Sequence, residues 1–102
     1  MKIRNMEKDY LNIIRELVIG ELKNEEVSIA LFGSFATGNN NDSSDVDVAI
    51  IPKGKSNRYK LTSLREKLEE LTIPYIVEII DFSTVSSSFR ESALENAIWW
   101  KL

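Results

Sequence analysis

Apolar residues recur at three- and four-residue steps in three stretches of the chain, which is the spacing of a helix with one buried face. These stretches run from Met6 to Leu22, from about Asn57 to Leu71, and from about Ser87 to Lys101. The apolar side of the second stretch contains Tyr59, Leu61, Leu64, Leu68 and Leu71. The pattern predicts three amphipathic helices, and the serines between positions 83 and 88 provide caps for the last of them.

Three short runs rich in β-branched and aromatic residues predict strands. They run from Val27 to Phe32, from Asp45 to Ile51, and from Tyr75 to Ile80. The predicted order is therefore helix, strand, strand, helix, strand, helix. Because neither an internal repeat nor a low-complexity linker interrupts this order, we expect a single domain over residues 1–102, of the α/β (α+β) class, with a small mixed β-sheet flanked by helices.

The composition narrows the chemistry that this domain can perform. The 102 residues include no cysteine and no histidine, which excludes disulfides, thiolate metal sites and histidine catalysis. Thirteen Lys and Arg against sixteen Asp and Glu give a net charge of −3, which disfavours nonspecific nucleic-acid binding. The sequence shows neither a signal peptide nor a run of about 18 apolar residues, so we expect no membrane association and a cytoplasmic location.

Two carboxylates lie on one face of the second predicted strand. Alternation along residues 45–51 puts Asp45 and Asp47 on the same side, with their backbones roughly 6 to 7 Å apart. Aspartate is a poor strand former and like charges repel, so a divalent cation between the two would explain why both are present. The alternative is a strand whose first residues simply face solvent.

A phosphate-binding bend is predicted directly after the first strand. Gly33 and Ser34 are followed by a short segment that we expect to form a helical turn capped by Ser34. Backbone N–H groups, a glycine that allows close approach and a hydroxyl together favour an anion. Gly33 and Gly38 have the spacing of a P-loop, but Asn39 stands where that motif requires lysine, so a P-loop is excluded. A calcium loop is excluded as well, because Asp45-x-Asp47 lacks the third oxygen ligand and the glycine that such a loop needs.

Together these two motifs resemble the signature of the DNA polymerase β-like nucleotidyltransferase superfamily. The segments Leu31-Phe32-Gly33-Ser34-Phe35-Ala36-Thr37-Gly38 and Ser44-Asp45-Val46-Asp47-Val48 are most similar to its minimal prokaryotic branch, the MNT type. The resemblance spans about residues 10–100 and implies a nucleotidyltransferase palm-like fold. It also implies that Gly33 and Ser34 contact nucleotide phosphates and that Asp45 and Asp47 bind magnesium.

The third carboxylate of the family is usually an aspartate on a following strand. The only acid within residues 75–80 is Glu78, which shares a face with Ile76 and Ile80, so the resemblance assigns that role to Glu78. A solvent-facing strand edge is the alternative explanation for Glu78. Asp81 has the opposite parity and ranks second. Because glutamate is one methylene longer than aspartate, the resemblance leaves catalysis less certain than nucleotide binding.

The resemblance implies a magnesium-dependent nucleotidyltransferase with two Mg²⁺ ions and a nucleoside triphosphate such as ATP. It would transfer an NMP, in the first instance AMP, to a hydroxyl acceptor on a partner protein, as MNT antitoxins are paired with helical HEPN toxins. Two alternatives stay open: a noncatalytic nucleotide-binding subunit of a two-component complex, and a small-molecule transferase of the antibiotic-modifying kind. The short chain disfavours the second, because little of it is left to form an acceptor pocket.

Two further features of the sequence have competing explanations. Trp99 and Trp100 would lie about 100° apart on the last helix, so both rings are not expected to be buried in a monomer. They would anchor a partner or a second copy of the chain, or pack as an ordinary terminal helix. Basic residues cluster after the second strand, where they would contact a triphosphate or an acidic partner, or would simply be solvated. These residues are Lys53, Lys55, Arg58 and Lys60.

Overall fold

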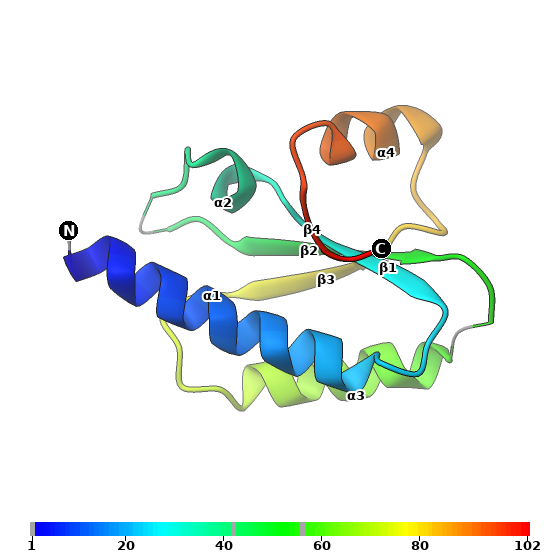
Figure 1. The fold of residues 1–102 in the computed structure, drawn as a ribbon, viewed down its shortest axis with the longest axis horizontal. Coiled ribbons are helices and arrows are strands. Elements are labelled where there is room, and N and C mark those ends of the chain that lie inside the picture. The colour runs from blue at the N-terminus through cyan, green and yellow to red at the C-terminus, as the bar shows by residue number, and fades with distance from the viewer. Residues whose placement is uncertain (1, 42, 56) are drawn as a thin grey trace.

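Four strands form one mixed sheet at the centre of the molecule (Figure 1). The computed structural model describes residues 2–41, 43–55 and 57–102, with side chains from residue 7 onward. The strands are β1 (Val27–Phe32), β2 (Val46–Pro52), β3 (Val77–Asp81) and β4 (Ile98–Lys101). They lie in the order β3-β2-β1-β4, in which β1 is antiparallel to β2 and to β4, and β2 is parallel to β3. The expected mixed sheet is therefore confirmed, with one strand more than the sequence predicted.

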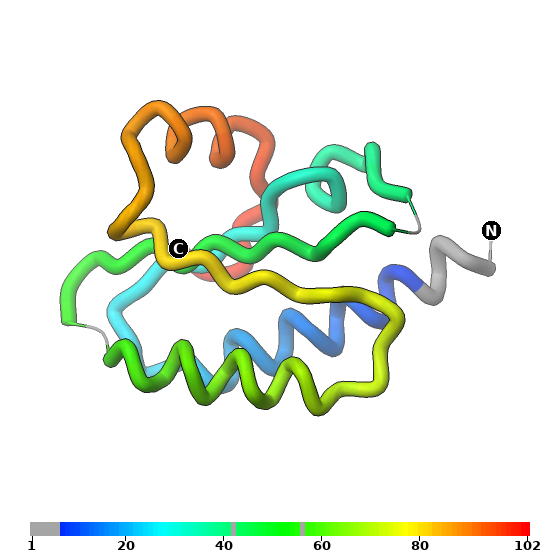
Figure 2. The backbone as a smooth tube through the Cα atoms, turned by 180° about the vertical axis from the view of Figure 1, so that it is seen from behind, coloured from blue at the N-terminus to red at the C-terminus, as the bar shows by residue number. Residues whose placement is uncertain are grey.

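Helices cover both faces of this sheet. Helices α1 (Lys2–Glu21) and α3 (Arg58–Glu69) lie side by side against one face, as Figures 1 and 2 show from opposite sides. An ion pair between Lys67 and Glu21 joins them. Helix α4 (Ser87–Leu94) lies over the other face, and the four-residue helix α2 (Ser34–Thr37) directly follows β1.

The two faces of β2 belong to two different hydrophobic clusters, as the alternation along this strand predicted. Val46, Val48 and Ile50 are buried in the larger cluster, which includes side chains of α1 and α3. Ala49 and Ile51 belong to the smaller cluster beneath α4. That smaller cluster is largely aromatic and contains Phe32 and Phe82, whose ring centroids lie 5.3 Å apart. Burial of the larger face against two helices provides most of the hydrophobic stabilisation of the fold.

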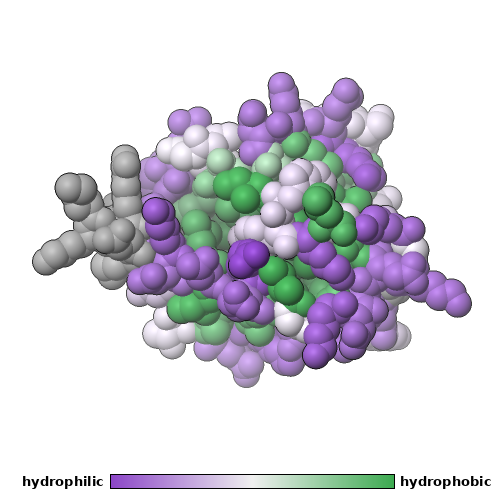
Figure 3. Space-filling view, viewed as in Figure 1, coloured by the Kyte–Doolittle hydropathy of each residue, from purple (hydrophilic) through white to green (hydrophobic). Residues whose placement is uncertain are grey.

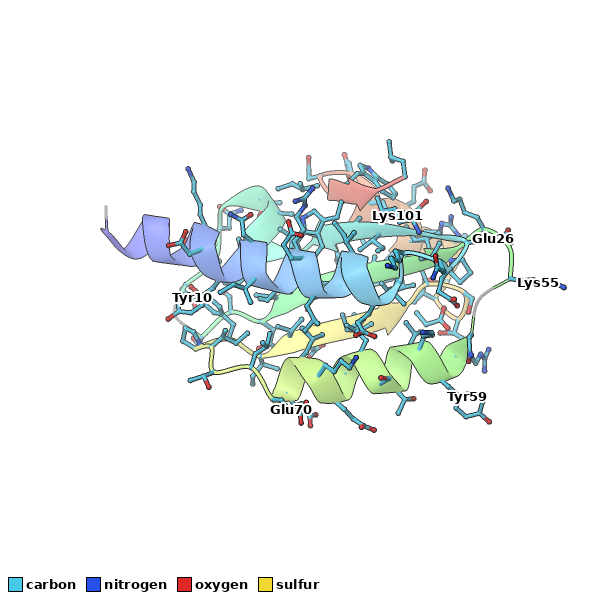
Figure 4. The ribbon with its side chains drawn as sticks, turned by 60° about the horizontal axis from the view of Figure 1, so that its bottom comes forward. Tyr10, Glu26, Lys55, Tyr59, Glu70 and Lys101 are labelled. Atoms are coloured by element: carbon cyan, nitrogen blue, oxygen red, sulfur yellow. The ribbon has the colours of Figure 1, made fainter. Side chains whose placement is uncertain are left out.

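The second predicted helix is confirmed, but α3 is shorter than predicted at both ends, because it ends at Glu69 and not at Leu71. The helix begins at Arg58, and the side chain of Asn57 caps it by accepting a hydrogen bond from the Tyr59 backbone N–H, 2.9 Å away. Tyr59 was expected on the buried side, but 84% of it is exposed, and it points away from the sheet (Figure 4). The helical spacing alone therefore gave the wrong burial for this residue.

The last predicted helix is wrong over its second half. Helix α4 ends at Leu94, and residues 98–101 form β4, which pairs with β1. Ile98, Trp99 and Trp100 favour a strand, and β1 offers a free edge that a continued helix could not use. The two Trp side chains therefore do not share a helix. Trp100 packs against the larger cluster, whereas 41% of Trp99 is exposed.

The third strand is also displaced from the predicted range. It begins at Val77 and includes Asp81. Tyr75, predicted as its first residue, instead packs edge to face against Tyr10 and Phe35, with ring centroids 5.8 and 5.1 Å away. This aromatic contact connects α1, α2 and the segment before β3. Among the described residues, no helix combines the length and the apolar character needed to cross a bilayer.

Candidate active site

Asp47 lies in the middle of a row of three side chains that crosses the sheet. The register pairs Asp47 of β2 with Phe32 of β1 on one side and with Glu78 of β3 on the other. Paired residues of neighbouring strands point to the same face, which here is the face covered by α4. Asp45 precedes β2 by one residue and has the same parity as Asp47. The structure thus places Glu78 on the same face as Asp47, and the carboxylates of Glu78 and Asp45 both lie near enough to act on that of Asp47.

Asp81, ranked second to Glu78, is not part of this group. It pairs with Ile50, whose side chain belongs to the opposite face of the sheet. The Asp81 carboxylate accepts a hydrogen bond from the backbone N–H of Ser83, 2.9 Å away, and so stabilises the turn after β3. Of Glu78 and Asp81, only Glu78 lies beside Asp47 in the row that crosses the sheet.

The bend after β1 lies directly against Asp47. Gly33 has φ 77°, and a Cβ atom at this position would lie 2.5 Å from the Asp47 Oδ2 atom. Both the left-handed backbone and the lack of space require glycine here. Gly33 therefore places the bend and the Asp47 carboxylate within reach of one small ligand.

The turn that follows is formed differently from the sequence-based prediction. Gly33 is the N-cap of α2 and Ser34 is its first helical residue, so Ser34 does not cap the helix. The Ser34 carbonyl accepts the backbone N–H of Asn39, 3.0 Å away, while its hydroxyl makes no hydrogen bond among the described residues. Buried Phe35 packs on Tyr75 and fixes the turn to the rest of the fold. The Ser34 hydroxyl is consequently available to a ligand.

Negative charge accumulates at this site without a basic partner. Burial first, then the Glu78 carboxylate and then the Asp45 carboxylate raise the pKa of Asp47 from 3.8 to about 6. Among the described residues, none forms an ion pair with, or donates a hydrogen bond to, the side chains of Asp45, Asp47 or Glu78. A cation is the ligand that such a cluster favours, and carboxylate oxygens are the donors that Mg²⁺ prefers.

The three carboxylates do not by themselves form a closed metal site. Within the described part of the chain, no three acidic side chains are close enough together to enclose a metal ion. Glu78 is exposed, whereas Asp45 and Asp47 are half-buried. The donor set fits Mg²⁺, but an ion held here would need further oxygens from a bound ligand, and phosphate oxygens beside Gly33 are suitable donors.

A small pocket that the sequence did not predict opens beside Gly33. Its volume is about 210 Å³, and its walls come from β1, α2, α4 and the residues after α4. Its lining residues include Phe32, Phe89, Ser92 and Asn96. The apolar spacing of the last predicted helix puts Phe89 and Ala93 on its buried side, and both line this pocket. No sequence motif marked Ser92 or Asn96 as pocket residues.

The basic cluster after β2 lies away from the carboxylates. Lys53 follows the far end of β2, six residues beyond Asp47, which corresponds to roughly 20 Å along an extended strand. Lys53, Lys55, Arg58 and Lys60 are exposed. A solvated entrance to α3 therefore explains this cluster better than a contact with a triphosphate at the carboxylates.

Comparisons with known proteins identify the family of this chain. The family described as Polymerase beta, Nucleotidyltransferase matches residues 12–99. The Haemophilus influenzae protein named Probable protein adenylyltransferase MntA is 32% identical over 66 residues, which cover 65% of this chain and 58% of that protein. The chain thus matches less than two thirds of this curated relative.

Solved structures share the fold. A chain described as a minimal nucleotidyltransferase is 25% identical, with a TM-score of 0.70 over 88% of this chain and 92% of that one. A chain from the complex of the tri-AMPylated Shewanella oneidensis HEPN toxin with an MNT antitoxin has a TM-score of 0.59 at 17% identity, over 87% of this chain and 70% of that one. The protein whose glycine-serine bend touches Asp47 therefore belongs to the polymerase β nucleotidyltransferase family, in its minimal (MNT) type.

Proposed function

We propose that this chain transfers AMP from ATP to a hydroxyl group on a HEPN-type partner protein, in a magnesium-dependent reaction. The observation that carries the proposal is the contact between Gly33 and Asp47, which puts a phosphate-binding bend and a carboxylate cluster within the span of one nucleotide. The MntA name of the Haemophilus relative supports the adenylyl group, and the AMPylated HEPN toxin in the Shewanella complex supports the acceptor.

The residues of the bend and of β2 would bind and orient the nucleotide. Gly33 lets phosphate oxygens approach the backbone, and the Ser34 hydroxyl donates a hydrogen bond to one of them. Asp45, Asp47 and Glu78 are the residues that would hold Mg²⁺. When bound, Mg²⁺ neutralises negative charge on the attacking and leaving oxygens.

Glu78 is the group best placed to accept the proton of the acceptor. The acceptor oxygen attacks the α-phosphorus of ATP, and a new O–P bond forms while the bond from the α-phosphorus to the bridging oxygen breaks. Pyrophosphate leaves, and the hydroxyl proton passes to the Glu78 carboxylate and from there to water. The chain contains no histidine that could take this role. Glu78 is exposed, so its carboxylate is accessible both to the acceptor and to the solvent.

A protein acceptor agrees with the surface of the molecule. Figure 3 shows hydrophobic side chains gathered in the middle of one face, where β1 and β4 lie in Figure 1. Strand β4 and the residue after it include three exposed large apolar side chains, Ile98, Trp99 and Leu102. Apolar surface of this kind is typical of an interface with another protein.

One observation favours a second candidate, a noncatalytic nucleotide-binding subunit. Glu78 is exposed and, among the described acids, completes no group of three that encloses a metal ion. ATP would then bind through Gly33, Ser34, Asp45 and Asp47 without turnover.

Transfer of label from α-³²P-ATP to a purified HEPN-type partner tests the proposal. We expect Mg²⁺-dependent labelling that Asp45→Asn reduces by at least about 100-fold, because the metal loses a direct ligand. Asp81→Asn is the matched control, since that carboxylate faces the opposite side of the sheet. Calorimetric binding of Mg-ATP without any labelling would identify the noncatalytic subunit instead, and labelling that survives Asp45→Asn contradicts both candidates.

A further inference from the structure

Strand β3 lies at an edge of the sheet, and a groove runs along it. The sheet order begins with β3, and Figure 2 shows this strand (yellow) running above α3. The groove between β3 and α3 has a volume of about 590 Å³. Apolar side chains of α3 and of the segment before β3 line it, among them Leu68, Leu71 and Ile73. Glu78 lines the same groove, which therefore reaches the active site.

The backbone of β3 has hydrogen-bonding groups that face outward. The carbonyl of Ile76 accepts the N–H of Val46, so residues 76, 78 and 80 face β2, and Val77 and Ile79 face away from the sheet. Arg65 donates a hydrogen bond to the outward carbonyl of Ile79, at 2.8 Å. Among the described residues, none accepts the outward N–H groups of Val77 and Ile79. An extended segment of another protein can therefore pair with this edge.

Such a segment would continue the row of side chains that crosses the sheet. Phe32, Asp47 and Glu78 are cross-strand neighbours, and a strand added beside β3 places its own side chain about 5 Å from Glu78 on the same face. We propose that the acceptor protein presents an extended segment to the β3 edge, with the hydroxyl residue that receives AMP beside Glu78. This inference rests on the proposed function, because it names how the acceptor reaches that site.

The groove also determines which residues flank the hydroxyl. The two neighbours of the hydroxyl residue point to the other face of the sheet, where Leu68, Leu71 and Ile73 favour apolar side chains. Glu69 and Glu78 line the groove and Glu70 lies next to it, whereas the one basic residue in its lining, Arg65, is hydrogen-bonded to the Ile79 carbonyl. This balance of charge favours basic residues farther out in the acceptor segment. The acceptor segment is thus a short strand with a central hydroxyl, apolar neighbours and basic ends.

A symmetric peptide, acetyl-Lys-Gln-Val-Tyr-Val-Gln-Lys-amide, is the probe for this surface, because it matches the pattern in either strand direction. Titration into the ¹⁵N-labelled chain, followed by NMR, is expected to shift the amide signals of Val77 and Ile79. Two N-methylated peptides provide the control. One is methylated at both Val residues, the other at Tyr and both Gln, so each loses the N–H groups of one strand edge.

Only one of the two methylated peptides should lose affinity, by at least about tenfold, because only one edge of the peptide pairs with β3. Ile76, of which 67% is exposed, provides a variant of the protein itself. Ile76→Lys places a positive charge beside the basic peptide and should weaken binding, whereas the control Tyr59→Lys should not. No binding at millimolar peptide, equal loss with both methylated peptides, or shifts confined to β4 would overturn the proposal.

The binding test uses no ATP, so it is independent of the proposed chemistry. Peptide binding at β3 without AMP transfer to a HEPN-type partner would refute the proposed function and leave the docking edge in place. AMP transfer to the partner together with failure of the peptide at β3 would refute the docking edge alone.

Discussion

Gly33 combines two constraints in one residue, since its backbone is left-handed and the Asp47 carboxylate occupies the space of its missing side chain. The same closeness that excludes a Cβ atom is what brings the bend to the carboxylates. The glycine of the family motif is thus explained by contacts within this chain as well as by the phosphate it is expected to meet.

Gly33→Ala should destabilise the fold by about 1 to 3 kcal/mol, because the new methyl group meets Asp47 Oδ2 and the residue keeps an unfavourable φ. Urea unfolding at neutral pH measures the loss. The matched control is Gly20→Ala in α1, where a Cβ atom would have no neighbour within 4 Å, and a gain of about 0.4 to 1 kcal/mol is expected. An equal effect of the two substitutions would contradict this explanation of Gly33.

Asp47 should make the ligand-free protein less stable at neutral pH than in mild acid. Its folded-state pKa of about 6 lies above the ordinary value of 3.8, so between these pH values the folded state binds more protons than the unfolded state. The contribution of Asp47 to stability is therefore greatest below pH 3.8, falls as the pH rises to about 6, and is constant above that.

Asp47→Asn should consequently stabilise the metal-free protein at pH 7.5 while it removes a metal ligand. We expect a gain of about 1 kcal/mol, less than the full pKa change would give, because water screens a half-buried carboxylate. Urea unfolding in EDTA at pH 7.5 and pH 4 measures it, with exposed Asp9→Asn as the control. A gain that is as large at pH 4 as at pH 7.5 would rule out this electrostatic origin.

At the scale of elements, the sequence correctly predicted those helices and strands that depend only on the pattern of neighbouring residues. Strand β1 has the predicted bounds, β2 is shifted by one residue so that Asp45 precedes it, and alternation along β2 correctly placed Asp47 on the face opposite to Val46 and Val48. Strand β4 was missed, because a short apolar run after a helix fits a continued helix equally well. Only the free edge of β1 favours a strand over a continued helix, and that edge cannot be read from the neighbouring residues. Ser92 and Asn96, which line the pocket beside Gly33, were missed because they are polar and belong to no motif.

Strand β4 is attached to the rest of the fold by its last residue as well as by β1. The Lys101 Nζ atom donates hydrogen bonds to the backbone carbonyls of Leu22 and Glu25, at 3.2 and 2.9 Å (Figure 4). These carbonyls lie just beyond the end of α1, where a cation is favourable, and each also accepts one backbone N–H, from Glu25 and from Val27 respectively.

Lys101→Met keeps most of the side-chain volume and removes both hydrogen bonds, so it should cost about 1.5 to 3 kcal/mol of unfolding free energy. Chemical denaturation measures the loss. Lys55→Met is the matched control, because that side chain is exposed and donates no hydrogen bond among the described residues. Equal stability of the two variants would show that the Lys101 hydrogen bonds do not help to hold β4 in place.

At the scale of the whole molecule, the two faces of the sheet differ in how firmly they are covered. The face under α1 and α3 carries the larger cluster, with buried residues from both helices. The active-site face carries the smaller cluster, and α4, which covers it, has no fully buried residue. Helices with little buried apolar surface open at a lower free energy than the rest of a fold. The cover of the active site is therefore the least stable layer of this domain.

Hydrogen exchange should reveal this asymmetry directly. Backbone amides of α4 are expected to exchange at least about tenfold faster than those in the middle of α3, because local opening of α4 exposes only the smaller cluster. Mg-ATP should slow exchange at residues 33–38, and EDTA should reverse that change if Asp45 and Asp47 hold the metal. Mass spectrometry of peptides from α3, from α4 and from residues 33–38 measures these exchange rates. None of the three carboxylates belongs to α3 or α4, so equal protection of both helices by Mg-ATP would indicate a general tightening of the fold. Protection confined to the bend and to β2 would instead locate the nucleotide where Gly33 lies against Asp47.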